Sequence, residues 1–125
     1  MTEHRLPTLA DIEAAAERIA DHAVETPLLE HPVLNDAAGG RVLLKAENFQ
    51  RTGSFKFRGA FNAVSQIDTQ AYPGGVVAAS SGNHAQGIAA AAHIRGCDAA
   101  IVMPSDAPEM KVMRTRGYGA EVIAY

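Results

Sequence analysis

The sequence predicts an α/β fold in which a parallel sheet carries helices on both faces. Three observations lead to this prediction. Short apolar runs recur in the second half of the chain, each bounded by glycine or proline, as buried strands are. Longer stretches with helical periodicity separate these runs. The connections are short, so right-handed crossovers are expected to bring the strands together in parallel.

The first half of the chain is predicted to hold one helix and one strand. The helix covers residues 9–23, where apolar side chains recur on one face behind a Thr8–Asp11 capping pair. It ends before Pro27, because the residue that precedes a proline is disfavoured in a helix. The strand covers residues 42–45, an apolar run that follows a glycine turn.

The second half alternates between helices and strands. Gly96 is expected to close the middle helix, at the position where a left-handed cap is common. The chain stops on a strand with no helix after it, as a truncated molecule would. The predicted helices cover residues 54–67, 83–95 and 108–116, and the predicted strands cover residues 75–79, 99–103 and 120–124.

The composition limits the class of function. With 47% hydrophobic and 20% charged residues the chain is typical of soluble globular proteins. A net charge of -3 gives no electrostatic case for nucleic acid or an anionic membrane. Cys97 is the single cysteine, which excludes an internal disulfide and fits a reducing compartment. The N-terminus lacks the apolar core of a signal peptide, so we expect a cytoplasmic protein.

The loop Ser80-Ser81-Gly82-Asn83-His84 follows a predicted strand and precedes a predicted helix. Ligands of open parallel sheets collect at such places, and small polar residues leave backbone amides accessible to a carboxylate or phosphate. A plainer interpretation is that Ser81 only caps the helix while Gly82 makes the turn. The loop lacks the Lys-Ser/Thr of a P-loop, and no G-x-G-x-x-G occurs in the chain.

Lys56 lies near the start of a predicted helix, between Phe55 and Phe57. The helix dipole and aromatic surroundings disfavour the charged form of an amine, which makes it a better nucleophile. A lone lysine is nevertheless a surface residue in most proteins. The interpretation of Lys56 as a nucleophile therefore depends on the sequence around it.

The segment Lys45–Ala60 closely resembles the lysine motif of fold-type II pyridoxal-phosphate enzymes, and Ser80–Gly87 resembles their asparagine loop. Ile101–Ala124 is similar to the same family, so the resemblance covers essentially the whole chain. Ser54-Phe55-Lys56-Phe57-Arg58-Gly59-Ala60 resembles the threonine dehydratase and serine racemase branch, whereas cysteine synthases and tryptophan synthase β-chains differ beside the lysine. The resemblance implies a tryptophan synthase β-like fold. Residues 1–53 would then belong to a large domain, and residues 54–125 would form most of a small one.

The same resemblance implies pyridoxal 5'-phosphate as cofactor and gives roles to individual residues. Lys56 would bind the cofactor covalently and, once released, would take the α-proton of the substrate. Asn83 would donate a hydrogen bond to the cofactor's phenolic oxygen, and Phe55 would lie against the ring. No metal site is expected, and His84 is interpreted as a loop residue. The segment that would receive the substrate carboxylate consists of Ser80, Ser81, Gly82, Asn83 and His84.

Two further matches concern racemisation and regulation. Ser81 matches the serine that acts as acid and base in serine racemases, on the face opposite the lysine, and racemisation requires such a second group. The alternative is that Ser81 only caps the helix or binds carboxylate. Thr52, Gln86 and Tyr118 match nucleotide-contacting positions of animal-type serine racemases, although Arg51 replaces a lysine there.

Three functions remain open from the sequence. The first is an ammonia-lyase that converts L-threonine or L-serine to a 2-keto acid with loss of the β-hydroxyl and of ammonia. The second is a racemase of serine or a related β-hydroxy amino acid. The third is a catalytically silent fragment, because the family's glycine-rich phosphate cradle, its partner for the pyridine nitrogen and its divalent-cation site lie beyond residue 125. The full-length form is expected to be a homo-oligomer that acts on a small amino acid.

Overall fold

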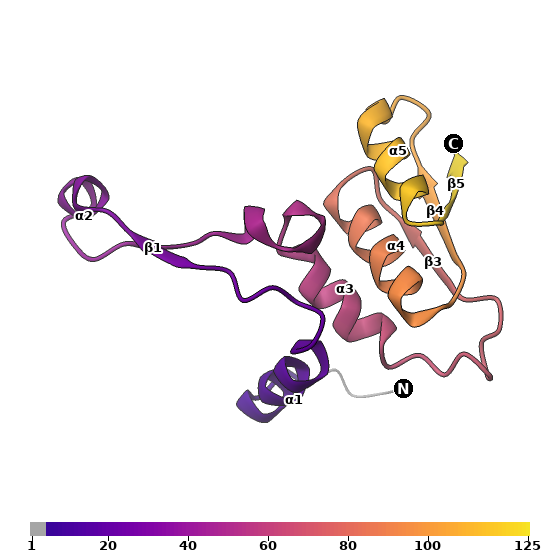
Figure 1. The fold of residues 1–125 in the computed structure, drawn as a ribbon, viewed down its shortest axis with the longest axis horizontal. Helices are drawn as coiled ribbons and strands as arrows, with labels where there is room; N and C mark the ends of the chain where they lie inside the picture. Colours follow the sequence, from indigo (N-terminus) through magenta and orange to yellow (C-terminus); the bar gives the residue numbers. More distant parts are fainter. Residues whose placement is uncertain (1–4) are drawn as a thin grey trace.

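The computed structural model describes residues 5–125, which form an arm and a layered α/β body (Figure 1). In the arm, two antiparallel strands lead to a short helix at the tip. The body contains a parallel sheet in the order β3-β4-β5. The strands are β1 (Leu28–Glu30), β2 (Leu43–Lys45), β3 (Val76–Ala79), β4 (Ala99–Met103) and β5 (Glu121–Ala124). The helices are α1 (Leu9–Ile19), α2 (Pro32–Ala38), α3 (Lys56–Val64), α4 (Asn83–Arg95) and α5 (Glu109–Gly117), with single 3-10 turns at η1 (Glu47–Phe49) and η2 (Arg51–Gly53).

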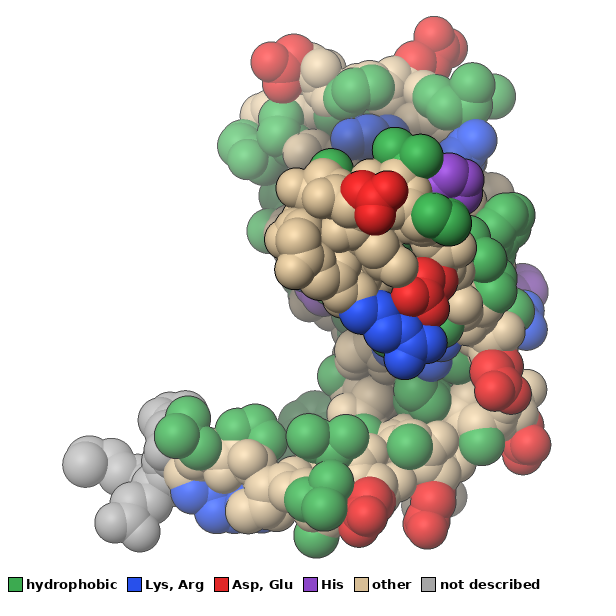
Figure 2. Space-filling model, turned by 90° about the vertical axis from the view of Figure 1, so that its left-hand side faces the viewer, with side chains coloured by type: hydrophobic (Ala, Val, Ile, Leu, Met, Phe, Trp, Pro, Cys, Tyr) green, Lys and Arg blue, Asp and Glu red, His purple; other side chains and the backbone are tan. Residues whose placement is uncertain are grey.

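The predicted cap of α1 is confirmed. The Asp11 amide donates to the Thr8 hydroxyl at 3.4 Å, and the Thr8 amide donates to the Asp11 carboxylate at 2.7 Å. The helix ends at Ile19, earlier than predicted, and the chain continues to Ala23 as a turn. Its apolar face is largely open, with Leu9 70% exposed. Hydrophobic side chains are visible along the lower part of the molecule in Figure 2, where α1 lies.

Strand β1 and helix α2 were not predicted from the sequence. The His31 ring nitrogen accepts a hydrogen bond from the Val33 amide at 3.3 Å, which caps α2. Pro32 occupies the first turn, and Gly39 follows the end with a φ of 65°. Proline just inside the start and glycine just past the end are typical helix boundaries, so these residues could have identified α2.

The predicted parallel α/β sheet is confirmed, with β4 paired in parallel to both β3 and β5. Both α4 and α5 lie on one face of this sheet (Figure 1). The strands are added in one direction, and successive right-handed crossovers then place their helices on the same side. Among residues 5–125 the other face carries no helix, and Val77 on it is 76% exposed. The expected second layer of helices is thus not found in this part of the chain.

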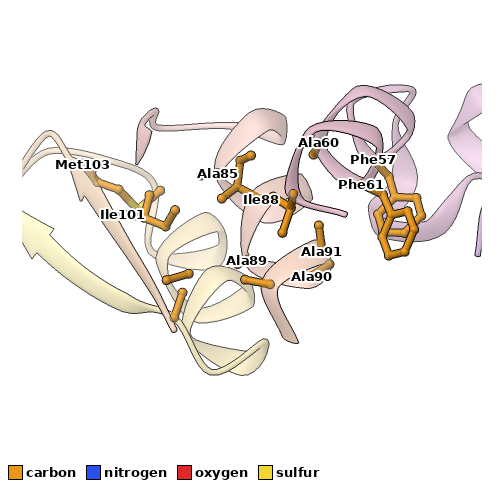
Figure 3. Close-up of a cluster of buried hydrophobic side chains, with 14 residues drawn as sticks. Phe57, Ala60, Phe61, Ala85, Ile88, Ala89, Ala90, Ala91, Ile101 and Met103 are labelled. Atoms are coloured by element: carbon orange, nitrogen blue, oxygen red, sulfur yellow. The ribbon is translucent and has the colours of Figure 1, made fainter. Parts of the chain in front are cut away.

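The core lies around α4, which is packed between the sheet and α3 (Figure 3). Every residue from Ala85 to Ala92 is buried, because one side of α4 faces Ile101 and Met103 and the other faces Phe57 and Phe61. A helix covered on all sides needs apolar residues all round, and alanines allow its neighbours to approach closely. This packing fixes the start of α3 beside α4. None of the helices in residues 5–125 is long and apolar enough to span a membrane.

Candidate active site

Lys56 is the first residue of α3, and its side chain is exposed. Its ammonium nitrogen lies 5.2 Å from the centre of the Phe55 ring. Phe57 points the other way and is fully buried in the core, since neighbouring helical residues face directions about 100° apart. Of the two aromatic residues that flank Lys56 in the chain, Phe55 therefore lies beside the amine and Phe57 belongs to the core.

Gly87 brings α4 against the first turn of α3. A β-carbon at this position would lie 3.3 Å from the carbonyl carbon of Lys56 and 3.2 Å from the β-carbon of Ala60. Both distances are shorter than an ordinary contact of about 3.5 to 4.0 Å, so the two helices approach this closely because residue 87 has no side chain. Gly87 lies about one turn after Asn83, the first residue of α4. The contact therefore sets Lys56 and the start of α4 close together.

The predicted carboxylate loop lies where β3 ends and α4 begins. The Ser80 amide donates to the Val102 carbonyl at 3.0 Å, and the Ser80 hydroxyl accepts from the Gly82 amide at 3.2 Å. Gly82 is the N-cap residue, and no side chain caps α4. The interpretation of Ser81 as the helix cap is therefore wrong. The first-turn amides of α4, those of Asn83 and His84 among them, are available to an anion, because no residue of the described chain accepts from them.

Lys111 is a residue that the sequence did not point to. It comes from α5, is half-buried, and its ammonium nitrogen would lie 3.7 Å from a β-carbon at Gly82. The described residues give this ammonium group no carboxylate within 4.0 Å. Its positive charge therefore adds to that of the helix amides at the loop. No local motif marks Lys111, because only the packing of α5 beside α4 brings it there.

The three residues matched to a nucleotide site line one cavity of about 420 Å³. Thr52 comes from η2, Gln86 from α4 and Tyr118 from the end of α5. The Thr52 hydroxyl is buried without a hydrogen-bond partner in the described chain. The full lining is Thr52, Gly53, Gln86, Arg114, Gly117 and Tyr118.

Arg114, and not Arg51, is the cation of this cavity. The Arg51 guanidinium lies 5.5 Å from the centre of the Phe57 ring and donates to the His22 carbonyl at 3.0 Å. Arg114 follows Lys111 on α5 and was not singled out in the sequence, where its surroundings are those of an ordinary surface helix.

The residues around Lys56 fit the ring of pyridoxal 5'-phosphate. Its amine makes no hydrogen bond or ion pair within residues 5–125, so it is available as a nucleophile. Asn83 is exposed and its side-chain amide has no hydrogen-bond partner within residues 5–125, so it can donate to a phenolic oxygen, and Phe55 offers an aromatic surface. The buried Ser54 hydroxyl, close to Lys56 in the chain, also lacks a partner in this part of the protein. No group of three or more metal-ligating side chains lies together among the described residues.

The structure thus has an exposed lysine at the start of α3 and an exposed asparagine at the start of α4, on two helices that pack together. The model of one such family, described as pyridoxal-phosphate dependent enzyme, matches residues 19–125. The chain belongs to this family, whose members depend on pyridoxal phosphate.

Curated relatives narrow the likeness. The chain is 50% identical over 120 residues to L-threo-3-hydroxyaspartate ammonia-lyase of Saccharomyces cerevisiae, with 96% of this chain and 37% of the relative covered. Serine racemase of Schizosaccharomyces pombe is 51% identical over 120 residues, and again 96% of this chain and 37% of the relative are covered. L-threonine ammonia-lyase of Thermotoga maritima is 48% identical, with 93% of this chain and 29% of the relative covered. The chain thus spans between 29% and 37% of the length of these three relatives.

The fold agrees with these relatives. The structure of maize serine racemase superposes with a TM-score of 0.90 at 38% identity, over 96% of this chain and 36% of that one. The family and the fold-type II architecture inferred from the motifs around Lys56 and Asn83 are confirmed.

Proposed function

We propose that the whole protein is a pyridoxal-phosphate-dependent ammonia-lyase acting on small β-hydroxy amino acids, with L-threonine and L-serine as substrates. The observation that carries the proposal is the close approach of Gly87 to the Lys56 backbone, which brings the start of α3 against the first turn of α4. The lyases of Saccharomyces cerevisiae and Thermotoga maritima act on hydroxyaspartate and threonine, both of which are β-hydroxy amino acids.

The residues of this chain would bind the cofactor ring and move one proton. When bound, pyridoxal 5'-phosphate withdraws electrons from the α-carbon of the substrate. Lys56 would hold the cofactor, and its amine nitrogen, once free, would accept the α-proton. Asn83 would donate to the phenolic oxygen, and Phe55 would exclude water from one side of the ring. Departure of the β-hydroxyl and hydrolysis then give a 2-keto acid and ammonia.

The loop from Ser80 to His84 would receive the substrate carboxylate. Its support is the set of open amides at the start of α4 and the ammonium group of Lys111 above Gly82. Both place positive charge where a carboxylate would lie, and charge-assisted hydrogen bonds are about twice as strong as neutral ones.

The test is covalent labelling of Lys56. The protein is incubated with pyridoxal phosphate, reduced with borohydride and digested, and the label is located by mass spectrometry. We expect the label on Lys56 and none in Lys56→Ala, while Lys45→Ala, at a lysine that donates to the Thr26 carbonyl at 2.6 Å, retains it. Absence of the label in a chain that continues through the natural reading frame would contradict the proposal. Absence only in the 125-residue chain would support the alternative of a silent fragment.

A racemase is the second candidate, and Ser81 is the observation that favours it. Its side chain is exposed and does not cap α4, and within residues 5–125 its hydroxyl makes no hydrogen bond, so it can exchange a proton. Chiral chromatography of serine after incubation with the enzyme separates the two functions. If Ser81 acts on the second face, Ser81→Ala abolishes D-serine formation and leaves keto-acid formation within a few-fold. Racemisation that survives in Ser81→Ala would rule out this role.

The cavity lined by Thr52, Gln86 and Tyr118 supports a nucleotide effector site, with Arg114 as the group that attracts phosphate. We expect ATP to bind the full-length protein and Arg114→Met to weaken that binding at least fivefold in calorimetric titration. Equal affinities of the two proteins for ATP would exclude Arg114 from the site.

A further inference from the structure

The loop that precedes Lys56 has a costly backbone. Thr52 has a φ of 67° and Gly53 a φ of 74°, so two successive residues are left-handed. Left-handed geometry is unfavourable for threonine, whose side chain branches at the β-carbon. The hydroxyl groups of Thr52 and Ser54 are also buried with no hydrogen-bond partner in the described chain. Such a conformation persists only where the surrounding structure over-determines it.

An ion pair between Glu47 and Arg58 joins the two ends of this loop. Glu47 is the first residue of η1, and Arg58 lies in the first turn of α3, two residues after Lys56. The Arg58 guanidinium donates to both carboxylate oxygens of Glu47, from Nε at 2.9 Å and from Nη2 at 2.8 Å. The side chains are 31% and 16% exposed for Arg58 and Glu47, respectively. A bidentate pair with little solvent contact restrains direction as well as distance.

The pair is also tied to the segment that follows α1. The Val24 carbonyl accepts from Arg58 Nη2 at 3.0 Å and from the Gln50 amide at 2.8 Å. The Thr26 hydroxyl donates to Glu47 at 2.6 Å. Hydrogen bonds from Arg58, assisted by that from Thr26, lower the pKa of Glu47 to about 2. The loop is therefore held by charged and neutral bonds from two separate parts of the chain.

We propose that the Glu47–Arg58 pair is a positioning device that holds the loop of residues 47–55 in its strained form and so directs the Lys56 amine toward the loop at Asn83. The inference rests on the proposed role of Lys56. Arg58 does not act on the substrate itself, because its Nε and Nη2 groups are engaged by Glu47 and Val24. Loss of the pair releases the loop, and the amine then spends less time in the reactive position.

The chain offers a matched control. Arg41 and Glu30 form an ion pair of similar length, with Arg41 Nη2 2.8 Å from the carboxylate, in the arm at β1. This pair is more exposed, at 72% for the Arg41 side chain, and it lies outside the loop. Arg58→Lys and Arg41→Lys therefore make the same chemical change, and only the first touches the loop before Lys56.

The experiment measures the reactivity of Lys56 in two ways. One is the rate at which borohydride traps pyridoxal phosphate on Lys56. The other, which needs no cofactor, is the rate and pH profile of reductive methylation of Lys56 by formaldehyde, read by mass spectrometry. In the full-length enzyme we expect Arg58→Lys to lower the trapping rate and kcat at least tenfold with KM within twofold, and to shift the methylation profile. Arg41→Lys should match the wild type in every measurement.

Each outcome decides one question. If the wild type carries no label at Lys56, the proposed function fails. If the wild type is labelled and Arg58→Lys behaves as Arg41→Lys does, the proposed function stands and the positioning role is wrong. Should Arg58→Lys fail to fold by circular dichroism, Thr26→Val removes only one bond to Glu47. It is expected to slow trapping about threefold in a folded protein, and a wild-type rate there contradicts the inference.

Discussion

Replacing Gly87 by alanine is expected to loosen the contact between α3 and α4, although alanine is the better helix former. The added methyl group would lie 3.2 Å from the β-carbon of Ala60 and 3.3 Å from the carbonyl carbon and oxygen of Lys56. These neighbours are a methyl group and backbone atoms within a helix, so none of them can rotate away. Relief requires the two helices to separate by a few tenths of an ångström.

Two opposing terms decide the size of the effect. Alanine in place of glycine inside a helix stabilises by about 1 kcal/mol. Overpacking a close contact in a core costs about 1 to 3 kcal/mol. The net change for Gly87→Ala is therefore a loss of about 0 to 2 kcal/mol in the free energy of unfolding. Gly59→Ala in α3 makes the same change where, apart from chain neighbours and the backbone of α3 itself, the described residues place no atom within 4 Å. Only the helix term then applies, and the variant should gain about 0.5 to 1 kcal/mol.

The assay is urea denaturation of the full-length protein at neutral pH, followed by circular dichroism, with both variants compared with the wild type. Activity is the second readout, because a displacement of Lys56 relative to Asn83 misplaces a reacting group, and an error of about 1 Å can cost about 100-fold in rate. We expect Gly87→Ala to lose about tenfold in kcat. The reasoning is refuted if Gly87→Ala is stabilised as much as Gly59→Ala and keeps full activity.

Two further predictions concern charge. Lys111→Met should raise the KM for the amino-acid substrate about fivefold with kcat little changed. This factor corresponds to the loss of roughly 1 kcal/mol that is expected for a half-exposed charge pair. An unchanged KM would show that Lys111 does not bind the substrate carboxylate. Hydrogen bonds from Arg58 hold the pKa of Glu47 at about 2, below its ordinary value of 4.5. The stability that the ionised Glu47 side chain contributes is therefore complete above pH 4.5 and is lost as the pH falls from about 4.5 to about 2. Because the site is partly solvated, the contribution is about 1 to 3 kcal/mol, and Glu47→Gln should show a flatter fall in urea midpoint between these pH values than the wild type does. If the urea midpoints of the two proteins fall in parallel with pH, Glu47 makes no such contribution to stability.

The helix ends and strands that depend on neighbouring residues in the chain could be predicted from the sequence. The cap at Thr8 and Asp11 and the closure of α4 at Gly96, which has a φ of 67°, depend on residues close together in the chain. The strand at 99–103 was predicted with the bounds it has, because an apolar run that ends at a proline allows few other structures. Helix α2 was missed although Pro32 and Gly39 mark its ends, since a short helix with exposed apolar residues has no clear periodicity.

The sequence also identified the family, because the residues around Lys56 and Asn83 form contiguous motifs. A motif is read along the chain, whereas the role of a side chain depends on what lies next to it in space. Ser81 illustrates the difference: its position suggested a helix cap, but the N-cap of α4 is Gly82, and in the described part of the chain the Ser81 hydroxyl makes no capping hydrogen bond.

What the sequence by itself determined is the order of helices and strands from residue 54 onward and the family to which the chain belongs. The role of Lys56 as the cofactor lysine stays a prediction. Which groups from distant parts of the chain contact the candidate site was decided by the tertiary structure alone. The ammonium group of Lys111 reaches Gly82, Arg114 joins Thr52 in one cavity, and the Arg58 guanidinium donates to the Val24 carbonyl. These contacts join residues far apart in the chain through the packing of α1, α3, α4 and α5. That packing depends on the close approach of whole helices, which no local pattern encodes.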